Sequence, residues 1–110
     1  MNRTVRILAS GAVQPIPPLY RNGAGVMADQ DTNEIMDYTV DWTGWLGSDT
    51  ISSSTWTATG VTLASAANTT KQASVRVSAV VGDSGEALNR VTTALGAVKD
   101  VTLRFNEIEG

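Results

Sequence analysis

The amino-acid sequence predicts an all-β sandwich, and three observations support this fold class. From residue 35 onward, short runs of alternating apolar and polar residues follow one another at a spacing of roughly ten residues, with turn residues between them. Fourteen Thr and nine Ser suit the exposed faces of strands and the turns between them better than they suit helices. No segment shows the apolar period of an amphipathic helix. Six or seven short strands are therefore expected.

The strands are predicted in chain order by these alternating runs. A short first strand is expected around residues 4–8. In the next one, DYTVDWTGW (37–45), Tyr38, Val40 and Trp42 lie on one side of the strand, and Gly44 ends it. Further strands are predicted at ISSSTWTA (51–58), VTLASA (61–66), ASVRVSAVV (73–81), ALNRVTTAL (87–95) and VKDVTLRFNEI (98–108).

The same alternation predicts which side chains face the core. In the last strand, Val101, Leu103 and Phe105 are expected to point inward, while Thr102 and Arg104 face water. In the run over 73–81, alternation places two sets of side chains on opposite faces of the strand. One set is Ala73, Val75, Val77, Ala79 and Val81, and the other is Ser74, Arg76 and Ser78.

Residues 1–34 are predicted to form an extended N-terminal arm in front of a sandwich domain that spans residues 35–110. The segment QPIPPLY (14–20) contains all three prolines, which favour a polyproline II conformation and cannot donate a backbone hydrogen bond to a sheet. The Asn22-Gly23 pair marks a turn. A disordered terminus explains the same composition equally well.

The missing residue types argue against an enzyme. The chain has no Cys and no His, so thiolate chemistry, the usual general base and the commonest metal ligand are absent. Asp37 and Asp41 share one face of a strand at a distance of about 13 Å, which is too far for a glycosidase pair. We therefore predict a non-enzymatic protein with no catalytic residue and no cofactor.

A calcium site is not predicted either. The segment DQDTN (29–33) matches the opening of a calcium-binding loop, but the sixth and twelfth positions of that loop do not carry the required Gly and Glu. A looser calcium site formed by Asp29, Asp31 and Asp37 is the alternative.

Charge is distributed unevenly along the chain, whose net charge is −3. Residues 1–26 carry Arg3, Arg6 and Arg21 and no acidic residue, whereas residues 27–50 carry six acidic residues and no basic one. An acidic block and a basic arm favour contact between neighbouring protein subunits. Three scattered arginines are a weak footprint for nucleic acid, and the apolar runs are too short to span a membrane. Neither nucleic acid nor a membrane is predicted as a partner.

The three tryptophans lie within residues 37–57 and have two interpretations. Trp42 shares a strand face with Tyr38 and is expected in the core, and Trp56 is expected there because it lies inside a strand. Trp45 lies beside glycines at the end of a strand and is expected to be exposed. In the alternative, exposed and coplanar indoles form a platform for a host-surface glycan.

Three stretches carry a resemblance to known proteins: DYTVDWTGWL (37–46), DTISSSTWT (49–57) and NRVTT (89–93). Together they resemble a family of small immunoglobulin-like proteins from the structural modules of tailed bacteriophages, some of which are fiber–tail adaptors. The resemblance covers residues 35–106. It implies an immunoglobulin-like β-sandwich without catalytic residues, located in the virion and working through contacts with other virion structural proteins. A tail or fiber adaptor and a capsid decoration protein both fit.

The charge pattern and the resemblance together predict the residues that contact partners. The arm is expected to lie along a neighbouring subunit, and the acidic strand face is expected to meet a basic or apolar surface. A homo-oligomer is expected because phage particles are symmetric. The predicted partner-binding residues are Arg3, Arg6, Pro17, Tyr20, Arg21, Asp37, Asp41 and Trp45.

Overall fold

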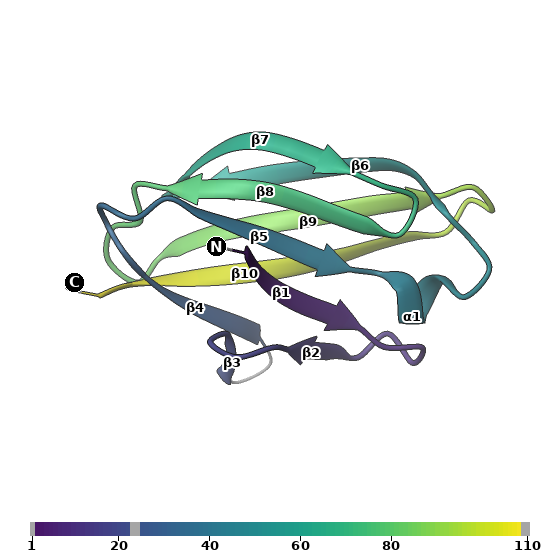
Figure 1. The fold of residues 1–110 in the computed structure, drawn as a ribbon, viewed down its shortest axis with the longest axis horizontal. Helices are drawn as coiled ribbons and strands as arrows, with labels where there is room; N and C mark the ends of the chain where they lie inside the picture. The colour runs from purple at the N-terminus through teal and green to yellow at the C-terminus, as the bar shows by residue number, and fades with distance from the viewer. Residues whose placement is uncertain (1, 23–24, 109–110) are drawn as a thin grey trace.

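The computed structural model describes residues 2–22 and 25–108, so Met1, Gly23 of the predicted turn and residues 109–110 of the predicted domain lie outside the described residues. Two five-stranded sheets face each other and confirm the predicted β-sandwich (Figure 1). The elements are β1 (Asn2–Ile7), β2 (Val13–Pro15), β3 (Tyr20–Asn22), β4 (Gly25–Asp31), β5 (Met36–Asp41), α1 (Thr43–Leu46), β6 (Ile51–Thr59), β7 (Thr62–Asn68), β8 (Gln72–Ser78), β9 (Gly85–Thr93) and β10 (Val98–Ile108).

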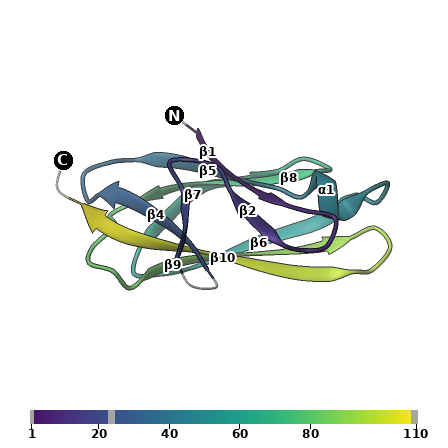
Figure 2. The same ribbon diagram turned by 90° about the horizontal axis from the view of Figure 1, so that it is seen from below.

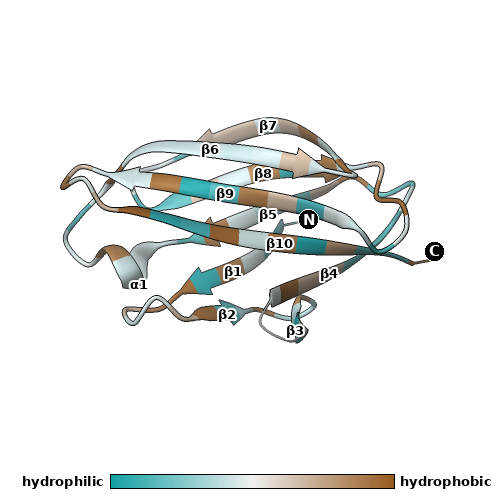
Figure 3. Cartoon of the chain, turned by 180° about the vertical axis from the view of Figure 1, so that it is seen from behind, coloured by the Kyte–Doolittle hydropathy of each residue, from teal (hydrophilic) through white to brown (hydrophobic). Residues whose placement is uncertain are grey.

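The strand order places the N-terminal strands in both sheets and the last two strands in the second sheet. The first sheet has the order β2-β1-β5-β8-β7, and the second has the order β3-β4-β10-β9-β6. Seen from below, the two sheets form two layers, with β5 and β8 in one and β9 and β10 in the other (Figure 2). Strands β2 and β3 lie along one long side of the sandwich, and β6 and β7 lie along the opposite side (Figures 1 and 3).

Seven of the ten strands match predicted ones, and β10 has the predicted bounds. Three strands, β2, β3 and β4, are additional to the six or seven expected. The one-turn helix α1 is also additional, because the sequence predicted only the end of a strand at this place.

The N-terminal segment is built into both sheets, which corrects the extended arm expected over residues 1–34. β1 pairs in parallel with β5, and β4 pairs in parallel with β10. Val5, Ile7, Val26 and Ala28 are buried in the core between the sheets. These side chains explain the correction, since an unpaired arm would leave them in contact with water.

The predicted core positions of the central strands are confirmed. Tyr38, Val40, Trp42 and Phe105 are fully buried, and the rings of Tyr38 and Phe105 pack edge to face with their centroids 5.3 Å apart. Val101 and Leu103 are buried beside Phe105. These strands therefore follow the simple alternation of their side chains.

The alternation predicted for residues 73–81 fails after β8. Ala79 adopts a positive φ of 58°, which turns the chain. As a result Val80 is fully buried, whereas Val81 is 61% exposed.

Candidate partner-binding surfaces

Arg3 is engaged with its own chain. Its Nη1 atom donates a hydrogen bond to the backbone oxygen of Asp29 at 2.6 Å and another to the hydroxyl oxygen of Tyr38 at 2.9 Å. The guanidinium also lies over the Tyr38 ring, 5.7 Å from its centroid. Arg3 thus ties β1 to β4 and β5 and holds the N-terminal strand in place.

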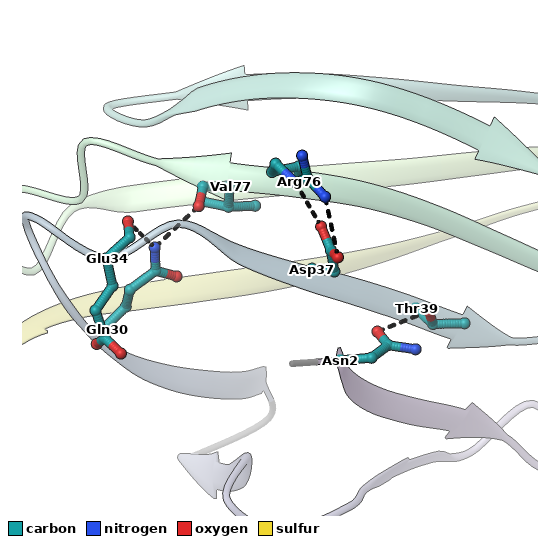
Figure 4. A network of polar contacts seen from close by, with 7 residues as sticks. All are labelled: Asn2, Gln30, Glu34, Asp37, Thr39, Arg76 and Val77. Carbon is teal, nitrogen blue, oxygen red and sulfur yellow. Dashed lines mark hydrogen bonds and ion pairs between the residues drawn. The ribbon is translucent and has the colours of Figure 1, made fainter.

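The hydrogen bonds continue from Tyr38 into the interior through Gln30. The Tyr38 hydroxyl donates to Gln30 Oε1 at 2.8 Å. Gln30 Nε2 in turn donates to the backbone oxygen atoms of Glu34 at 3.0 Å and Val77 at 2.9 Å (Figure 4). Gln30 is fully buried, so its amide is tolerated in the core because both of its ends are hydrogen-bonded.

This network predicts a loss of stability at alkaline pH. Burial raises the pKa of Tyr38 from 10.0 to about 12. The corresponding stabilisation is complete below the unfolded pKa and is lost as the pH rises through the folded pKa. A shift of this size corresponds to about 2–3 kcal/mol of unfolding free energy. We expect the thermal denaturation midpoint, followed by circular dichroism, to fall between about pH 10 and pH 12.

Two phenylalanine variants separate this effect from other alkaline titrations. Tyr38→Phe should be less stable than the wild type at neutral pH, because it loses the hydroxyl bonds to Arg3 and Gln30. Its stability should nevertheless fall less steeply with rising pH, since the variant has no buried phenol to ionise. Tyr20→Phe should flatten the slope less than Tyr38→Phe does, because the pKa of Tyr20 is also raised but its side chain is exposed. Equal alkaline slopes for the wild type and Tyr38→Phe would contradict the assignment.

Pro17, Tyr20 and Arg21 lie on the long side formed by β2 and β3. The Tyr20 hydroxyl donates to Asp29 Oδ1 at 2.7 Å, and this hydrogen bond raises the pKa of Tyr20. Arg21 Nη2 donates to the backbone oxygen of Val13. Pro17 is exposed, and Tyr20 is 40% exposed. The structure therefore brings these three predicted residues together on one accessible side.

Arg6, Asp37 and Asp41 lie on the outer face of the first sheet. Arg6 and Asp41 are register partners on β1 and β5, so opposite charges are neighbours within one chain. Asp37 forms an ion pair with Arg76 of β8 at 2.8 Å, and this contact lowers the pKa of Asp37 (Figure 4). Asp41 Oδ1 accepts hydrogen bonds from the backbone N–H and the hydroxyl of Thr43 at the start of α1. The basic N-terminal residues and the acidic residues that follow them are thus neighbours on the surface of one chain.

Sequence reasoning missed Arg76 and the hollow beside it. The outer face of the first sheet is hollowed here over a volume of about 290 Å³, lined by polar side chains that include Asn2, Thr39 and Ser74. The Thr39 hydroxyl donates to Asn2 Oδ1 at 3.0 Å (Figure 4). Only the register of β1, β5 and β8 brings these residues together, so no local sequence signal indicates the hollow.

Trp45 lies in α1 and is half-buried, so it is less exposed than the sequence suggested. Its ring packs edge-on against Trp42 with the centroids 5.5 Å apart and the planes at 62°. Gly44 permits the close approach of α1 to β1, because a Cβ atom there would lie 2.9 Å from the backbone oxygen of Ile7. The helix is therefore held between the core and the N-terminal strand.

Exposed apolar side chains lie at both ends of the sandwich, and at this end they accompany the half-buried Trp45. Leu8, in the turn after β1, is 40% exposed, and Leu95, between β9 and β10, is 83% exposed. Asp49 Oδ1 accepts a hydrogen bond from the backbone N–H of Leu95 at 3.3 Å, which holds this hairpin near the helix. We call the surface formed by Leu8, Trp45 and Leu95 the α1 end. Sequence reasoning missed both leucines, although an apolar residue directly before Gly96 in a turn was a readable signal.

The tryptophans do not form a shared exposed platform. Trp42 is fully buried, and its Nε1 atom donates to Asn89 Oδ1 at 3.0 Å. Trp56 is half-buried against the edge of the core, which corrects the expectation that it lies inside it. Because Trp45 packs edge-on against Trp42, the three indoles offer no common plane for a sugar ring.

The structure also addresses metal sites and membrane spans within residues 2–22 and 25–108. In this part of the chain, no group of three or more side chains of the types that bind metal ions comes together, so Asp29, Asp31 and Asp37 do not form the looser calcium site. In the same residues, no helix has the length and apolar character needed to cross a membrane.

Comparison with known proteins identifies the family. The model of the podophage GP4 fiber-tail adaptor protein gp77 family matches residues 30–106, which is more than half of the chain and extends from the end of β4 to β10. Strands β1 to β3 lie outside the matched range. No curated protein sequence matches the chain. The chain therefore belongs to the podophage GP4 fiber-tail adaptor protein gp77 family and is a structural protein of the phage virion.

Proposed function

We propose that the protein is a non-enzymatic adaptor that joins other virion proteins, and that the α1 end is its main contact surface. The observation that carries this proposal is the gathering of Leu8, Trp45 and Leu95 at one end of the sandwich. Large apolar side chains that stay exposed in a folded domain mark sites of protein–protein contact. Trp45 suits an anchor, since Trp is enriched among residues that dominate binding energy.

An adaptor needs a second surface, and the side formed by β2 and β3 supplies one. Arg6, Pro17, Tyr20 and Arg21 are exposed there or on the adjoining face of β1. Asp37 and Asp41 extend this surface across the outer face of the first sheet. We propose that these residues contact a second virion protein, while Arg3 acts by fixing β1.

Binding to purified fiber and tail proteins of the same phage tests the α1 end. Leu95→Ser should weaken binding about tenfold, which corresponds to about 1.4 kcal/mol lost from an interface anchor. Leu95 is the better target than Trp45, because Trp45 packs against the core and its loss would also disturb the fold. Affinity is measured by isothermal titration calorimetry.

The matched control is Val81→Ser at the opposite end of the sandwich. Val81 is also an exposed apolar residue, with 61% exposure. This variant should bind with wild-type affinity. Equal losses for both variants, or none for Leu95→Ser, would exclude the α1 end as the contact surface.

We also propose that the sandwich is immunoglobulin-like. The neighbours β5-β8-β7 in one sheet and β10-β9-β6 in the other correspond to the B-E-D and G-F-C orders of immunoglobulin domains. β4 and β3 extend the second sheet beyond the last strand. This order supports the finer assignment of the fold.

The glycan-binding alternative has less support. It required exposed, coplanar tryptophans, and Trp42 is fully buried. We therefore propose protein partners, including further copies of this chain in the particle.

A further inference from the structure

One long side of the sandwich carries no charge. Residues 50–70 contain no Asp, Glu, Lys or Arg, although 8 basic and 11 acidic residues lie elsewhere in the chain. These residues form β6 and β7, which run together along the upper side in Figures 1 and 3. In Figure 3, β6 is pale along most of its length, whereas β9 and β10 alternate between strongly hydrophilic and hydrophobic residues. We call the surface formed by residues 51–68 the β6 side.

The other edge strands carry features that block further pairing. β2 and β3 have three residues each, β2 ends at Pro15 and β3 contains the charged Arg21. β7 is interrupted by an irregularity between Ala64 and Ala67. Short length, proline, charge and bulges are the usual means by which proteins prevent edge strands from pairing with other chains.

β6 has none of these features over most of its length. It has nine residues, and its single register shift lies at its start, between Ile51 and Ser53. Six of the nine residues are exposed. Because β6 ends its sheet, the backbone groups on its outer edge are open to pairing with another strand.

Trp56 gives this edge an aromatic anchor. The residue is half-buried, and its Nε1 atom is buried without a hydrogen-bond partner among the described residues. Ala58, two positions further, is exposed although its register partner Ala87 is fully buried. The β6 side is therefore open beside Trp56 and can receive another chain.

A second copy of this chain fits the β6 side. A charge close to the two-fold axis would face the same charge of the other copy, and residues 50–70 carry no charge that could cause such repulsion. Antiparallel pairing of β6 with itself about Thr55 places Thr55 opposite Thr55 and Ser53 opposite Thr57, which are favourable cross-strand pairs. Nine paired residues extend over about 30 Å. With an extent of 22 Å along the shortest axis of the molecule, the contact covers about 660 Å² per copy, close to the roughly 800 Å² of a standard interface.

We propose that two copies of the chain associate through the β6 side, with their β6 strands antiparallel across a two-fold axis. The second sheets of the two copies then form one continuous sheet, and each Trp56 is covered by the other copy. This inference rests on the proposed function, in which the chain works in several copies within the particle.

Sedimentation velocity of the purified full chain over a range of concentrations tests the proposal. The wild type should show a reversible monomer–dimer equilibrium. Ala58→Lys should weaken dimerisation at least tenfold, because it places a charge on each side of the two-fold axis. Thr57→Lys, on the exposed outer face of the same strand, should weaken it as well and serves if Ala58→Lys does not fold.

The matched control is Ala12→Lys, the same substitution at an exposed position on the opposite long side. It should dimerise as the wild type does. A wild type that stays monomeric at every concentration, or folded lysine variants of β6 with wild-type dimerisation, would overturn the proposal. Neither result bears on the proposal that the α1 end contacts other virion proteins, because that proposal is tested by the binding of Leu95→Ser to fiber and tail proteins.

Discussion

Replacing Trp42 with alanine should lower the free energy of unfolding by about 4–8 kcal/mol. Truncating a buried aromatic side chain costs about 3–5 kcal/mol. The substitution also removes the indole donor that bonds to Asn89 Oδ1, and Asn89 is fully buried. An unsatisfied buried acceptor costs about 1–3 kcal/mol more. For a domain whose total stability is about 5–15 kcal/mol, this change leaves little folded protein on heating. Urea denaturation followed by circular dichroism measures it.

Trp56→Ala is the matched control for this prediction. It makes the same substitution in a half-buried side chain whose Nε1 atom has no hydrogen-bond partner among the described residues. We expect clearly less than half the loss seen for Trp42→Ala. Equal losses at the two positions would contradict the different burial of the two indoles.

Removing the apolar side chains of β1 should destabilise the whole sandwich. Val5 and Ile7 are almost fully buried, with 0% and 1% exposure. We expect the double variant Val5→Ala/Ile7→Ala to lose about 4–6 kcal/mol of unfolding free energy, because it removes all the methyl and methylene groups beyond Cβ at two buried positions and leaves a cavity beside β5. Thermal denaturation and urea denaturation measure this loss.

The control lies between the two positions. Arg6 is exposed on the same strand, so Arg6→Ala should change the stability by less than about 0.5 kcal/mol. If the double variant were as stable as Arg6→Ala, residues 2–7 would behave as a detachable arm and not as a strand of the sandwich. The experiment thus decides directly between the arm expected from sequence and the parallel β1–β5 pairing.

The sequence was sufficient to predict the central strands because their side chains alternate in and out of a single core. Tyr38, Val40 and Trp42 show this pattern. The N-terminal strands could not be predicted in this way. Their partners are distant in sequence: Arg3 pairs with Tyr38, 35 residues later, and Asp29 lies beside Asn106, 77 residues later. β2 and β3 have only three residues each and contain or lie close to prolines, so they show no alternation from which a strand could be predicted.

The sequence predicted that some single residues of the candidate surfaces are exposed, but it did not predict which of them lie next to one another. The exposed outer position of Asp37 follows from alternation, whereas its ion pair with Arg76 depends on the register of β5 and β8. Leu95 becomes notable only because Asp49 and α1 lie next to its hairpin. A sequence read locally cannot supply such contacts, because they arise from packing between elements that are distant in the chain.

The parallel pairing of β4 with β10 has a consequence for the order of folding during synthesis. β10 is made long after β4, so β4 can pair only with the short strand β3 until β10 has left the ribosome. The hairpin of β9 and β10 forms from adjacent segments, and it must then capture a strand made 77 residues earlier. We expect slow folding dominated by this late step, as is usual for sheets built from distant pairings. Chains that stop before β10 would expose β4 and Val26, and in a cell these are the products that chaperones and proteases would meet first.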